Sequence, residues 1–305
     1  MSKKEDPYLL HMFNPTKNVS PFDVNMAYEA DFDGVIPYTE VALEDIHALT
    51  QDTIFSRGKK GVERTGIFIG GREFGLAIDM LKRAKSAMVP PFEISVFADP
   101  SGAITTAAAL MACVEAKFKQ KTGSDLEGKR VDILGGTGPV GVCAGILAAQ
   151  CGAEVYLTSH RGARIATEFA SEYNNRFNID MHGQGSSNNE DVLEFMRKSD
   201  IVIAAAKAGI QVLSKQQLQA AENLSIAADV NAVPPVGIEG IDVFDMGKEL
   251  DFTPNKALGL GALAIGDVKY KVHNKLFEMM KDPDSVVYLE HEEAFKVARK
   301  FAPAD

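Results

Sequence analysis

The chain has 305 residues, of which 46% are hydrophobic and 24% charged, a composition typical of a globular protein long enough for two domains. Its 42 acidic residues outnumber its 32 basic ones, and the resulting net charge of −10 argues against nucleic acid or an anionic membrane as a partner. The three cysteines form no C-x-x-C pair, and no apolar run approaches the roughly 18 residues of a membrane helix. We therefore expect a soluble, cytoplasmic protein without a disulfide framework.

Short apolar runs alternate with helical patterns along nearly the whole chain, which is typical of an α/β protein. Pro90 and Pro91 end one helical pattern because proline lacks the amide donor that a helix needs. A polar, turn-rich segment at 122–129 marks a boundary between two domains. Before that segment the predicted strands are 8–13, 65–71 and 92–100, and the predicted helices are 73–88 and 104–123.

The second part of the chain repeats the alternation more regularly. Its predicted strands are 130–136, 153–159, 199–206 and 224–231, and its predicted helices are 139–152, 163–177 and 214–223. Beyond residue 265 the pattern is helical, over 268–281 and 291–301, with no strand to flank. We predict an N-terminal α/β substrate domain at 1–125, a Rossmann-type parallel-sheet cofactor domain at 126–266, and C-terminal helices at 267–305 that pack back on the first domain.

The segment GTGPVG at 136–141 matches the G-x-G-x-x-G fingerprint of dinucleotide-binding domains, directly after a predicted strand and at the start of a predicted helix. Its glycines serve the tight turn, the approach of the backbone to a pyrophosphate, and the packing of helix on strand. The first amides of the helix would then face the diphosphate. The alternative is a glycine turn that binds nothing. The predicted cofactor-binding residues of this loop are Gly136, Thr137, Gly138, Pro139, Val140 and Gly141.

The end of the next strand favours NADP over NAD. NAD-specific folds place a carboxylate there to bind the ribose 2′-hydroxyl, whereas this chain has Ser159, His160 and Arg161. A hydroxyl and a guanidinium suit a 2′-phosphate. The alternative is a solvated basic loop, and nothing in the segment excludes NAD.

Two further positions border the expected cofactor site. Ala205 ends a strand with a side chain small enough for the cofactor to lie against the backbone, although a tight strand–helix corner explains it equally well. Asn231 precedes the Pro234–Pro235 loop and is a candidate to hydrogen-bond a nicotinamide or a substrate amide. A loop asparagine also serves turns, so both interpretations stay open.

Several catalytic patterns are missing from the sequence. The six histidines are scattered, no cluster has the spacing of metal ligands, and there is no G-x-S-x-G elbow. No residue stands out as a base for a hydroxyl proton. We therefore predict no metal site and no catalytic side chain, and favour a hydride transfer that leaves a cation and needs no proton acceptor.

The chain resembles the NAD(P)-dependent methylene-tetrahydromethanopterin dehydrogenases of bacterial one-carbon metabolism, a family with relatives that also use methylene-tetrahydrofolate. The motifs that carry the resemblance follow one another along nearly the whole chain. They are SPFDV (20–24), TIFSRG (53–58), IFIGG (67–71), DPSGAITTAAA (99–109), LGGTGPVG (134–141), DVNAVPPVGIEGID (229–242), GALAIG (261–266) and KYKVH (269–273).

The resemblance implies a two-domain subunit with the pterin in the cleft between the domains, a homo-oligomer built on trimers, and no metal or flavin. It implies oxidation of 5,10-methylene-tetrahydromethanopterin to the 5,10-methenyl form by direct hydride transfer to NADP⁺. The carbon that loses hydride lies between two nitrogens whose lone pairs stabilise the cation, so alignment is the main task of the protein. No motif places a lysine for hydrolysis of the methenyl product, and we predict no cyclohydrolase activity.

The residues expected to contact the pterin lie within these motifs. A carboxylate would hold the N–H donors of the pterin or stabilise the methenyl cation, yet Asp23 and Asp99 also fit helix caps. Thr105 and Thr106 either contact the ligand or simply begin a helix. Lys269 either faces the cleft or lies on the surface of a helix without contacting the ligand. The predicted substrate-binding residues are Asp23, Asp99, Gly102, Thr105, Thr106 and Lys269.

Two other functions stay open at this point. One is an NADP-dependent methylene-tetrahydrofolate dehydrogenase, because the two carriers differ outside their common ring. The other is a Rossmann module that senses a nucleotide without turnover. The long first domain and the returning C-terminal helices argue against the second alternative.

Overall fold

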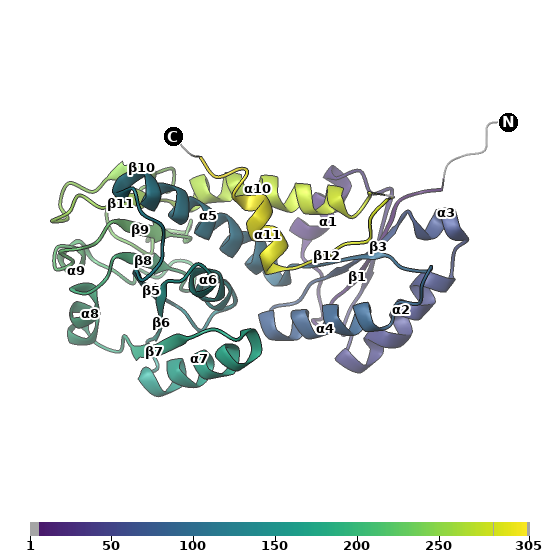
Figure 1. Cartoon of the computed structure of the whole chain (residues 1–305), viewed down its shortest axis with the longest axis horizontal. Coiled ribbons are helices and arrows are strands. Elements are labelled where there is room, and N and C mark those ends of the chain that lie inside the picture. Colours follow the sequence, from purple (N-terminus) through teal and green to yellow (C-terminus); the bar gives the residue numbers. More distant parts are fainter. Residues whose placement is uncertain (1–5, 283, 304–305) are drawn as a thin grey trace. The chain divides into compact units, whose positions relative to one another are not determined.

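The computed structural model describes residues 6–282 and 284–303 and divides the chain into two compact units (Figure 1). Unit 1 takes in the chain up to Thr105 together with Tyr270–Val297. Unit 2 takes in Thr106–Lys269 together with the chain from Ala298 onward. The chain thus passes between the units within three helices, α5 (Ala103–Thr122), α10 (Ala262–Met279) and the end of α11 (His291–Ala298), whereas the expected boundaries lie at 125/126 and 266/267.

The described residues of unit 1 form a parallel five-stranded sheet in the order β12-β4-β3-β1-β2. Its central strands are wholly apolar or nearly so, and every residue of β3 is buried, as expected for a parallel sheet covered on both faces. The strands are β1 (Leu9–Phe13), β2 (Gly34–Tyr38), β3 (Thr65–Ile69), β4 (Ser95–Ala98) and β12 (Tyr288–Leu289). The other elements are α1 (Pro21–Glu29), η1 (Leu43–Asp45), α2 (Ile46–Phe55), α3 (Lys59–Val62), α4 (Phe74–Ser86), η2 (Pro100–Gly102) and most of α11 (His291–Ala298).

Helix α4 shows how sequence produces this packing. Phe74, Ala77, Ile78, Leu81 and Ala84 recur at spacings of three and four residues and are all buried. The helix packs on β3 and β4 and ends shortly before Pro90–Pro91, as predicted.

The described residues of unit 2 form a seven-stranded sheet in the order β10-β11-β9-β8-β5-β6-β7, parallel except for β10. Figure 1 shows α6 and α7 on one face of this sheet and α8 and α9 on the other. The strands are β5 (Arg130–Leu134), β6 (Glu154–Ser159), β7 (Met181–Gly185), β8 (Ile201–Ala204), β9 (Ile226–Asp229), β10 (Met246–Glu249) and β11 (Leu258–Leu260). The helices are α6 (Pro139–Gln150), α7 (Ala163–Phe177), α8 (Asn189–Met196) and α9 (Lys215–Leu218).

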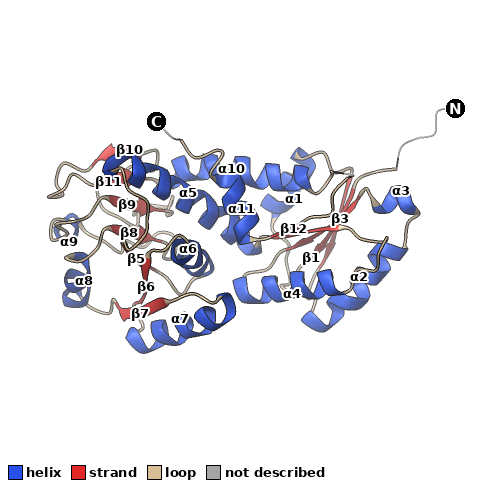
Figure 2. Ribbon diagram, viewed as in Figure 1, coloured by secondary structure: helices blue, strands red, loops and turns tan. Residues whose placement is uncertain are grey.

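The predicted α/β class and Rossmann-type sheet are confirmed, but several elements are absent from the prediction (Figure 2). The strands that the sequence did not predict are short. Two of them, β7 (MHGQG) and β10 (MGKE), carry glycine and polar residues instead of an apolar run. The C-terminal segment was expected to be helical only, yet β12 lies between α10 and α11 and pairs with β4. The strands absent from the prediction are β2, β7, β10, β11 and β12.

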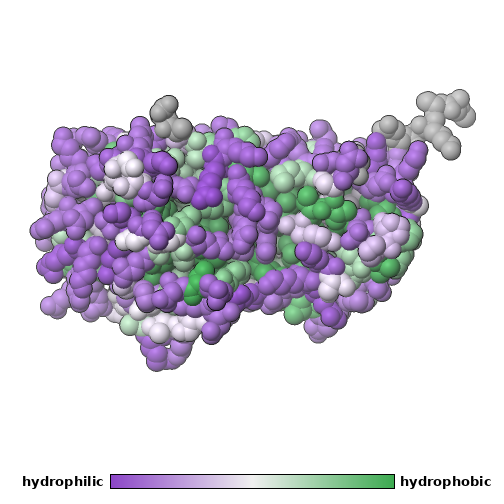
Figure 3. All heavy atoms as spheres, in the orientation of Figure 1, coloured by the Kyte–Doolittle hydropathy of each residue, from purple (hydrophilic) through white to green (hydrophobic). Residues whose placement is uncertain are grey.

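The face of the molecule drawn in Figure 3 is largely hydrophilic, with smaller apolar areas between the polar side chains. Within the described ranges, no helix is both long and apolar enough to cross a membrane.

Candidate functional site

The candidate cofactor site lies where the sheet of unit 2 changes direction. From β5 the chain goes to β6 on one side, and from β7 it crosses to β8 on the other side of β5. Open α/β sheets bind ligands at such a switch point, beyond the carboxyl ends of the strands. The loops after β5 and β8 are joined there, because the Ala205 amide donates to the Leu134 carbonyl at 2.8 Å.

The loop after β5 is a tight glycine turn that leads directly into α6. The amide of Gly138 donates to the carbonyl of Gly135 at 2.9 Å, and Gly138 is the extended N-cap of the helix. Pro139 occupies the first helical position, where its missing amide costs no hydrogen bond. Thr137 through Val140 are half-buried, so the free amides of the first helical turn lie beside accessible surface.

The four glycines of this loop have different steric roles. A Cβ on Gly135 would lie 2.6 Å from the Ala206 Cα, and on Gly141 it would lie 2.5 Å from the Gly135 carbonyl oxygen. A Cβ on Gly136 would lie 2.8 Å from the Leu157 Cα. On Gly138, by contrast, the nearest atom would be 3.3 Å away. The first three positions are closed by the protein itself, whereas at Gly138 a Cβ would require its nearest neighbour, the Gly135 carbonyl oxygen, to shift by only a few tenths of an ångström.

Gly135 is a functional position that the sequence analysis missed. It has a φ of +76°, the left-handed conformation that glycine adopts readily, so the tight turn belongs to Gly135 instead of Gly136. The doubled glycine in LGGTG was the available signal.

The loop after β6 presents the residues predicted to distinguish NADP from NAD. Ser159 is buried, and its Oγ accepts from the Arg161 amide at 3.2 Å, which shapes the turn into α7. His160 and Arg161 are exposed. In the part of the chain that the structure describes, the Arg161 guanidinium makes no ion pair, whereas Arg164 pairs with Glu168 at 2.5 Å. The turn contains no carboxylate, so its free positive charge suits an anionic ligand.

The loops after β8 and β9 are held together by Asn231. Its side-chain oxygen accepts from the amides of Val233 at 2.9 Å and Gly209 at 3.1 Å, and its amide group donates to the Pro235 carbonyl at 2.8 Å. These contacts are the turn role that the sequence offers for Asn231. Its contact with a nicotinamide or a substrate stays a prediction, and Ala205 beside it is half-buried.

Asp229 at the end of β9 is a second residue that sequence reasoning missed. It is buried, and its carboxylate accepts from the amides of Asn231 and Ile238, each at 2.9 Å. Burial raises the pKa of Asp229, while the backbone hydrogen bonds oppose that rise. The Asp229 carboxylate thus joins the two ends of the loop that contains Pro234 and Pro235.

The carboxyl edge of the sheet in unit 1 is built from side-chain hydrogen bonds. Asp99 follows β4 and is fully buried; its Oδ1 accepts from the amides of Ile104 at 2.8 Å and Thr105 at 3.2 Å. Its Oδ2 accepts from the Thr105 hydroxyl at 2.6 Å. These contacts are those of a helix cap at the start of α5, and direct pterin contacts of Asp99 and Thr105 stay predictions.

The remaining predicted pterin ligands occupy different positions. Gly102 is buried with a φ of +66°, next to Ser101, which has a φ of +53°. Asp23 is buried in the first turn of α1 in unit 1. Thr106 on α5 and Lys269 on α10 are half-buried and lie at the points where unit 2 begins and ends.

Comparisons with known proteins now bear on this geometry. A family model described as the N-terminal part of methylene-tetrahydromethanopterin dehydrogenase matches residues 21–101. The chain is 42% identical over 294 residues to the NAD(P)-dependent methylenetetrahydromethanopterin dehydrogenase of Methylorubrum extorquens, covering 96% of this chain and 98% of that protein. The chain belongs to this dehydrogenase family.

Two further similarities are more distant. The bifunctional protein MdtA of the same organism is 32% identical, covering 99% of this chain and all of that protein. The crystal structure of shikimate 5-dehydrogenase from Listeria monocytogenes, in complex with shikimate and NAD, matches with a TM-score of 0.53 at 15% identity. That match covers 90% of this chain and 92% of the other, and it confirms the fold alone.

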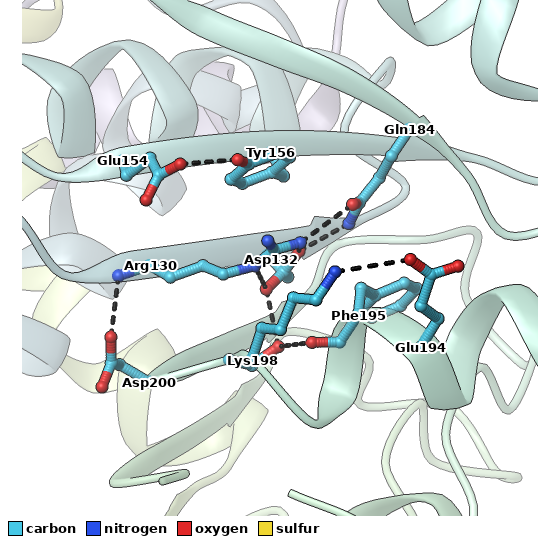
Figure 4. Close-up of polar contacts among 10 residues, drawn as sticks. Arg130, Asp132, Glu154, Tyr156, Gln184, Glu194, Phe195, Lys198 and Asp200 are labelled. Carbon is cyan, nitrogen blue, oxygen red and sulfur yellow. Dashed lines mark hydrogen bonds and ion pairs between the residues drawn. The ribbon is translucent and has the colours of Figure 1, made fainter.

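In this family member the largest polar network of the sheet serves the architecture. Figure 4 shows Arg130 beside Asp132, with Gln184 reaching the same carboxylate from β7. Asp132 is fully buried and accepts from Arg130 Nε at 2.9 Å and from the Ser199 hydroxyl at 2.6 Å. Burial works against the charge of Arg130, but its hydrogen bonds to Asp132 raise its pKa overall. The network ties β5 to β7 on one side and to the segment that leads into β8 on the other.

A cavity of about 430 Å³ adjoins this network. Tyr156 carries the Arg130 guanidinium over its ring at 3.8 Å, and Lys198 pairs with Glu194 at 3.4 Å. Basic and acidic groups alternate around the cavity, so it has no charge preference for a phosphate. Among the described residues, no three His, Cys, Asp or Glu side chains gather as a metal site would require.

Proposed function

We propose that this chain oxidises 5,10-methylene-tetrahydromethanopterin to the 5,10-methenyl form by direct hydride transfer to NADP⁺, with NAD⁺ as an alternative acceptor. The observation that carries the proposal is the 42% identity to an NAD(P)-dependent methylenetetrahydromethanopterin dehydrogenase along 96% of the chain. The glycine loop at the switch point of the sheet supports it, because this is where Rossmann-type folds bind dinucleotides.

The chain's own residues would divide the dinucleotide among three loops. Gly138 leaves room for the pyrophosphate beside the free amides at the start of α6. Ser159, His160 and Arg161 would receive the 2′-phosphate, since Arg161 has no competing carboxylate. The Asn231 contacts hold the loops after β8 and β9 at the position where the nicotinamide would lie. When bound, the cofactor supplies the hydride acceptor.

The reaction needs alignment more than acid–base catalysis. Loss of hydride from a carbon between two nitrogens leaves a delocalised cation, so no proton has to be removed. Three of the buried carboxylates, those of Asp99, Asp132 and Asp229, accept hydrogen bonds from protein groups. This arrangement fits the proposal that no side chain of the enzyme acts as a base.

The substrate domain, the assembly and the location in the cell belong to the same proposal. Residues 1–125 with the C-terminal segment 267–305 would bind the pterin, through Asp23, Gly102, Thr106 and Lys269 in particular, and residues 126–266 would bind NADP⁺. The active form would be a trimer-based homo-oligomer in the cytoplasm, without cyclohydrolase activity.

A spectrophotometric assay tests the function. The purified protein is mixed with NADP⁺ and methylene-tetrahydromethanopterin, and NADPH is followed at its absorbance maximum. Parallel reactions with methylene-tetrahydrofolate and with NAD⁺ establish the preferred carrier and acceptor. Nucleotide binding without turnover of either carrier would contradict the proposal and indicate a sensing module. Hydrolysis of added methenyl substrate would contradict the absence of cyclohydrolase activity.

A further inference from the structure

Phe244 is the most exposed of the large apolar side chains that the structure describes, at 71%. It lies in a turn formed by residues 242–245, where an exposed phenylalanine has no packing role. The turn is ordered by its own hydrogen bonds: the Phe244 amide donates to Asp242 Oδ1 at 2.9 Å, and the Asp242 amide donates to Asp245 Oδ2 at 2.8 Å. The backbone that carries the exposed ring is therefore fixed by hydrogen bonds within the turn.

The same turn is fastened to the first residues of α10. The Gly261 amide donates to the Asp245 carbonyl at 2.7 Å, and the Leu263 amide donates to the Val243 carbonyl at 2.8 Å. A Cβ on Gly261 would lie 2.1 Å from the Asp242 carbonyl oxygen, so the two segments approach as closely as glycine permits. Leu263, itself 41% exposed, follows directly on the helix. Two separate parts of the chain thus hold Phe244 in place.

The position of this turn in the sheet relates it to the cofactor loops. Gly261 follows β11, which is parallel to β9, as β9 is to β8 and β8 to β5. The turn therefore lies at the carboxyl edge that carries the glycine loop. It is three strand spacings from β5, about 14 Å at about 4.8 Å per strand, and only one spacing from β9.

We propose that Phe244, flanked by Leu263, is the aromatic platform on which the planar pterin ring of the carrier stacks. The inference rests on the proposed function and adds to it a pterin contact from residues 126–266, the part of the chain proposed to bind NADP⁺. A dinucleotide whose pyrophosphate lies at β5 extends its nicotinamide toward the ends of β8 and β9, and the next strand end along the edge belongs to β11. A ring stacked on Phe244 would lie beside the nicotinamide, as direct hydride transfer requires. Aromatic side chains bind planar heterocycles by their faces.

A protein partner is a weaker explanation of the same exposed ring. A stable interface between proteins buries at least about 1,200 Å² in total, which one phenylalanine and one leucine do not approach. The apolar surface of Phe244 and Leu263 matches the size of one flat ring.

The test compares the wild-type enzyme with Phe244→Ala, Phe244→Tyr and the control Phe177→Ala. Phe177 is a half-buried phenylalanine of unit 2 at the end of α7, just before β7, and so lies at the edge of the sheet opposite the cofactor loops. We expect Phe244→Ala to raise the KM for methylene-tetrahydromethanopterin about tenfold, the loss of one stacking contact, with the Kd for NADP⁺ within a factor of two of wild type. Phe244→Tyr retains the ring face and keeps the wild-type KM, as does Phe177→Ala.

Calorimetric binding of tetrahydromethanopterin separates this inference from the proposed function. Wild-type protein that does not oxidise the carrier contradicts the function, whereas equal affinity of wild type and Phe244→Ala for the carrier contradicts the platform. Equal losses of carrier and NADP⁺ binding in Phe244→Ala would also overturn it, since they indicate a structural role. So would a changed oligomer mass by light scattering with an unchanged KM.

Discussion

The carboxyl edges of the two sheets differ most at their glycine-rich loops. In unit 2 the loops after β5 and β8 carry mostly glycine and alanine residues, and the free hydrogen-bonding groups of the loop after β5 are main-chain amides at the start of α6, whereas Asp229 and Asn231 after β9 bind backbone groups. In unit 1 the edge consists of polar side chains that bind the protein's own backbone. Asn14 donates to the Thr16 and Asn18 carbonyls, each at 2.8 Å, and Asp99 caps α5.

This difference explains why one candidate site can be predicted from the sequence and the other cannot. An edge that binds a ligand through its backbone requires small residues at particular spacings. A short sequence motif therefore predicts its function. An edge whose polar side chains serve caps and turns looks the same in sequence as one whose side chains bind a ligand. The predictions below test that contrast, from the largest expected effect to the smallest.

Gly138→Ala should separate binding from folding most clearly. The new Cβ has 3.3 Å to its nearest neighbour in the protein, but it would occupy the space of the pyrophosphate. We expect roughly 100-fold weaker NADP⁺ binding, because the charge-assisted hydrogen bonds of the loop are lost, with a nearly unchanged melting temperature. Titration calorimetry and thermal melts measure the two quantities.

Two other glycines are the controls for this prediction. Gly141→Ala places its Cβ 2.5 Å from a carbonyl oxygen and should lower the melting temperature as well. Gly58→Ala, at the extended N-cap of α3, meets no atom within 4 Å and should change neither quantity. A Gly138→Ala protein with wild-type affinity would show that the cofactor does not approach this backbone.

Asp99→Ala should act on stability, because this carboxylate serves its helix. The change removes the cap of α5 and leaves the Thr105 hydroxyl and two buried amides without their acceptor. We expect a loss of about 3 kcal/mol in the free energy of unfolding, with NADP⁺ affinity unchanged. Urea titration measures the loss, and the exposed Asp52→Ala on α2 is the control. Wild-type stability combined with lost pterin binding would instead make Asp99 a ligand.

Arg161→Ala should weaken NADP⁺ more than NAD⁺. Loss of a contact between a guanidinium and the 2′-phosphate costs about 1.5–3 kcal/mol, and NAD⁺ has a hydroxyl in place of that 2′-phosphate. Kd values for both nucleotides measure the difference. Arg164→Ala is the matched control, since its side chain is already paired with Glu168. Equal effects of Arg161→Ala on the two cofactors would show that another group reads the phosphate.

Mild acid should weaken unit 1 through His291, one of its two buried histidines among the described residues. Burial lowers the pKa of His291 on α11 to about 4, from 6.5. Below pH 6.5 the unfolded chain binds a proton that the folded chain excludes, so stability falls as the pH drops toward 4. The expected loss is about 1 kcal/mol at pH 6.

Urea titrations at several pH values measure this loss. His291→Gln should flatten the dependence between pH 6.5 and 5, and the exposed His160→Gln in unit 2 should leave it unchanged. Equal slopes for wild type and His291→Gln would contradict the assignment.

The accuracy of the sequence-based predictions follows how strongly each segment is patterned. The helix predicted at 163–177 begins and ends as predicted, and α6 starts at Pro139 as the motif requires. Strand β7 was missed because Gly183 and Gly185 replace the apolar side chains that mark a strand. The pairing of β7 with β6 compensates for that local weakness, and no local pattern records it.

The amino-acid sequence by itself determined the α/β class, the glycine loop and the family, because periodicity and turn chemistry act between residues that are close in the chain. The tertiary structure decided what the polar groups do. It showed that Asp99 caps α5, that Gly135 makes the left-handed turn, and that the turn of Phe244 lies at the carboxyl edge of the sheet in unit 2. The physical reason is that a hydrogen-bond partner or a neighbouring strand can come from anywhere in the sequence, as β11 pairs with β9.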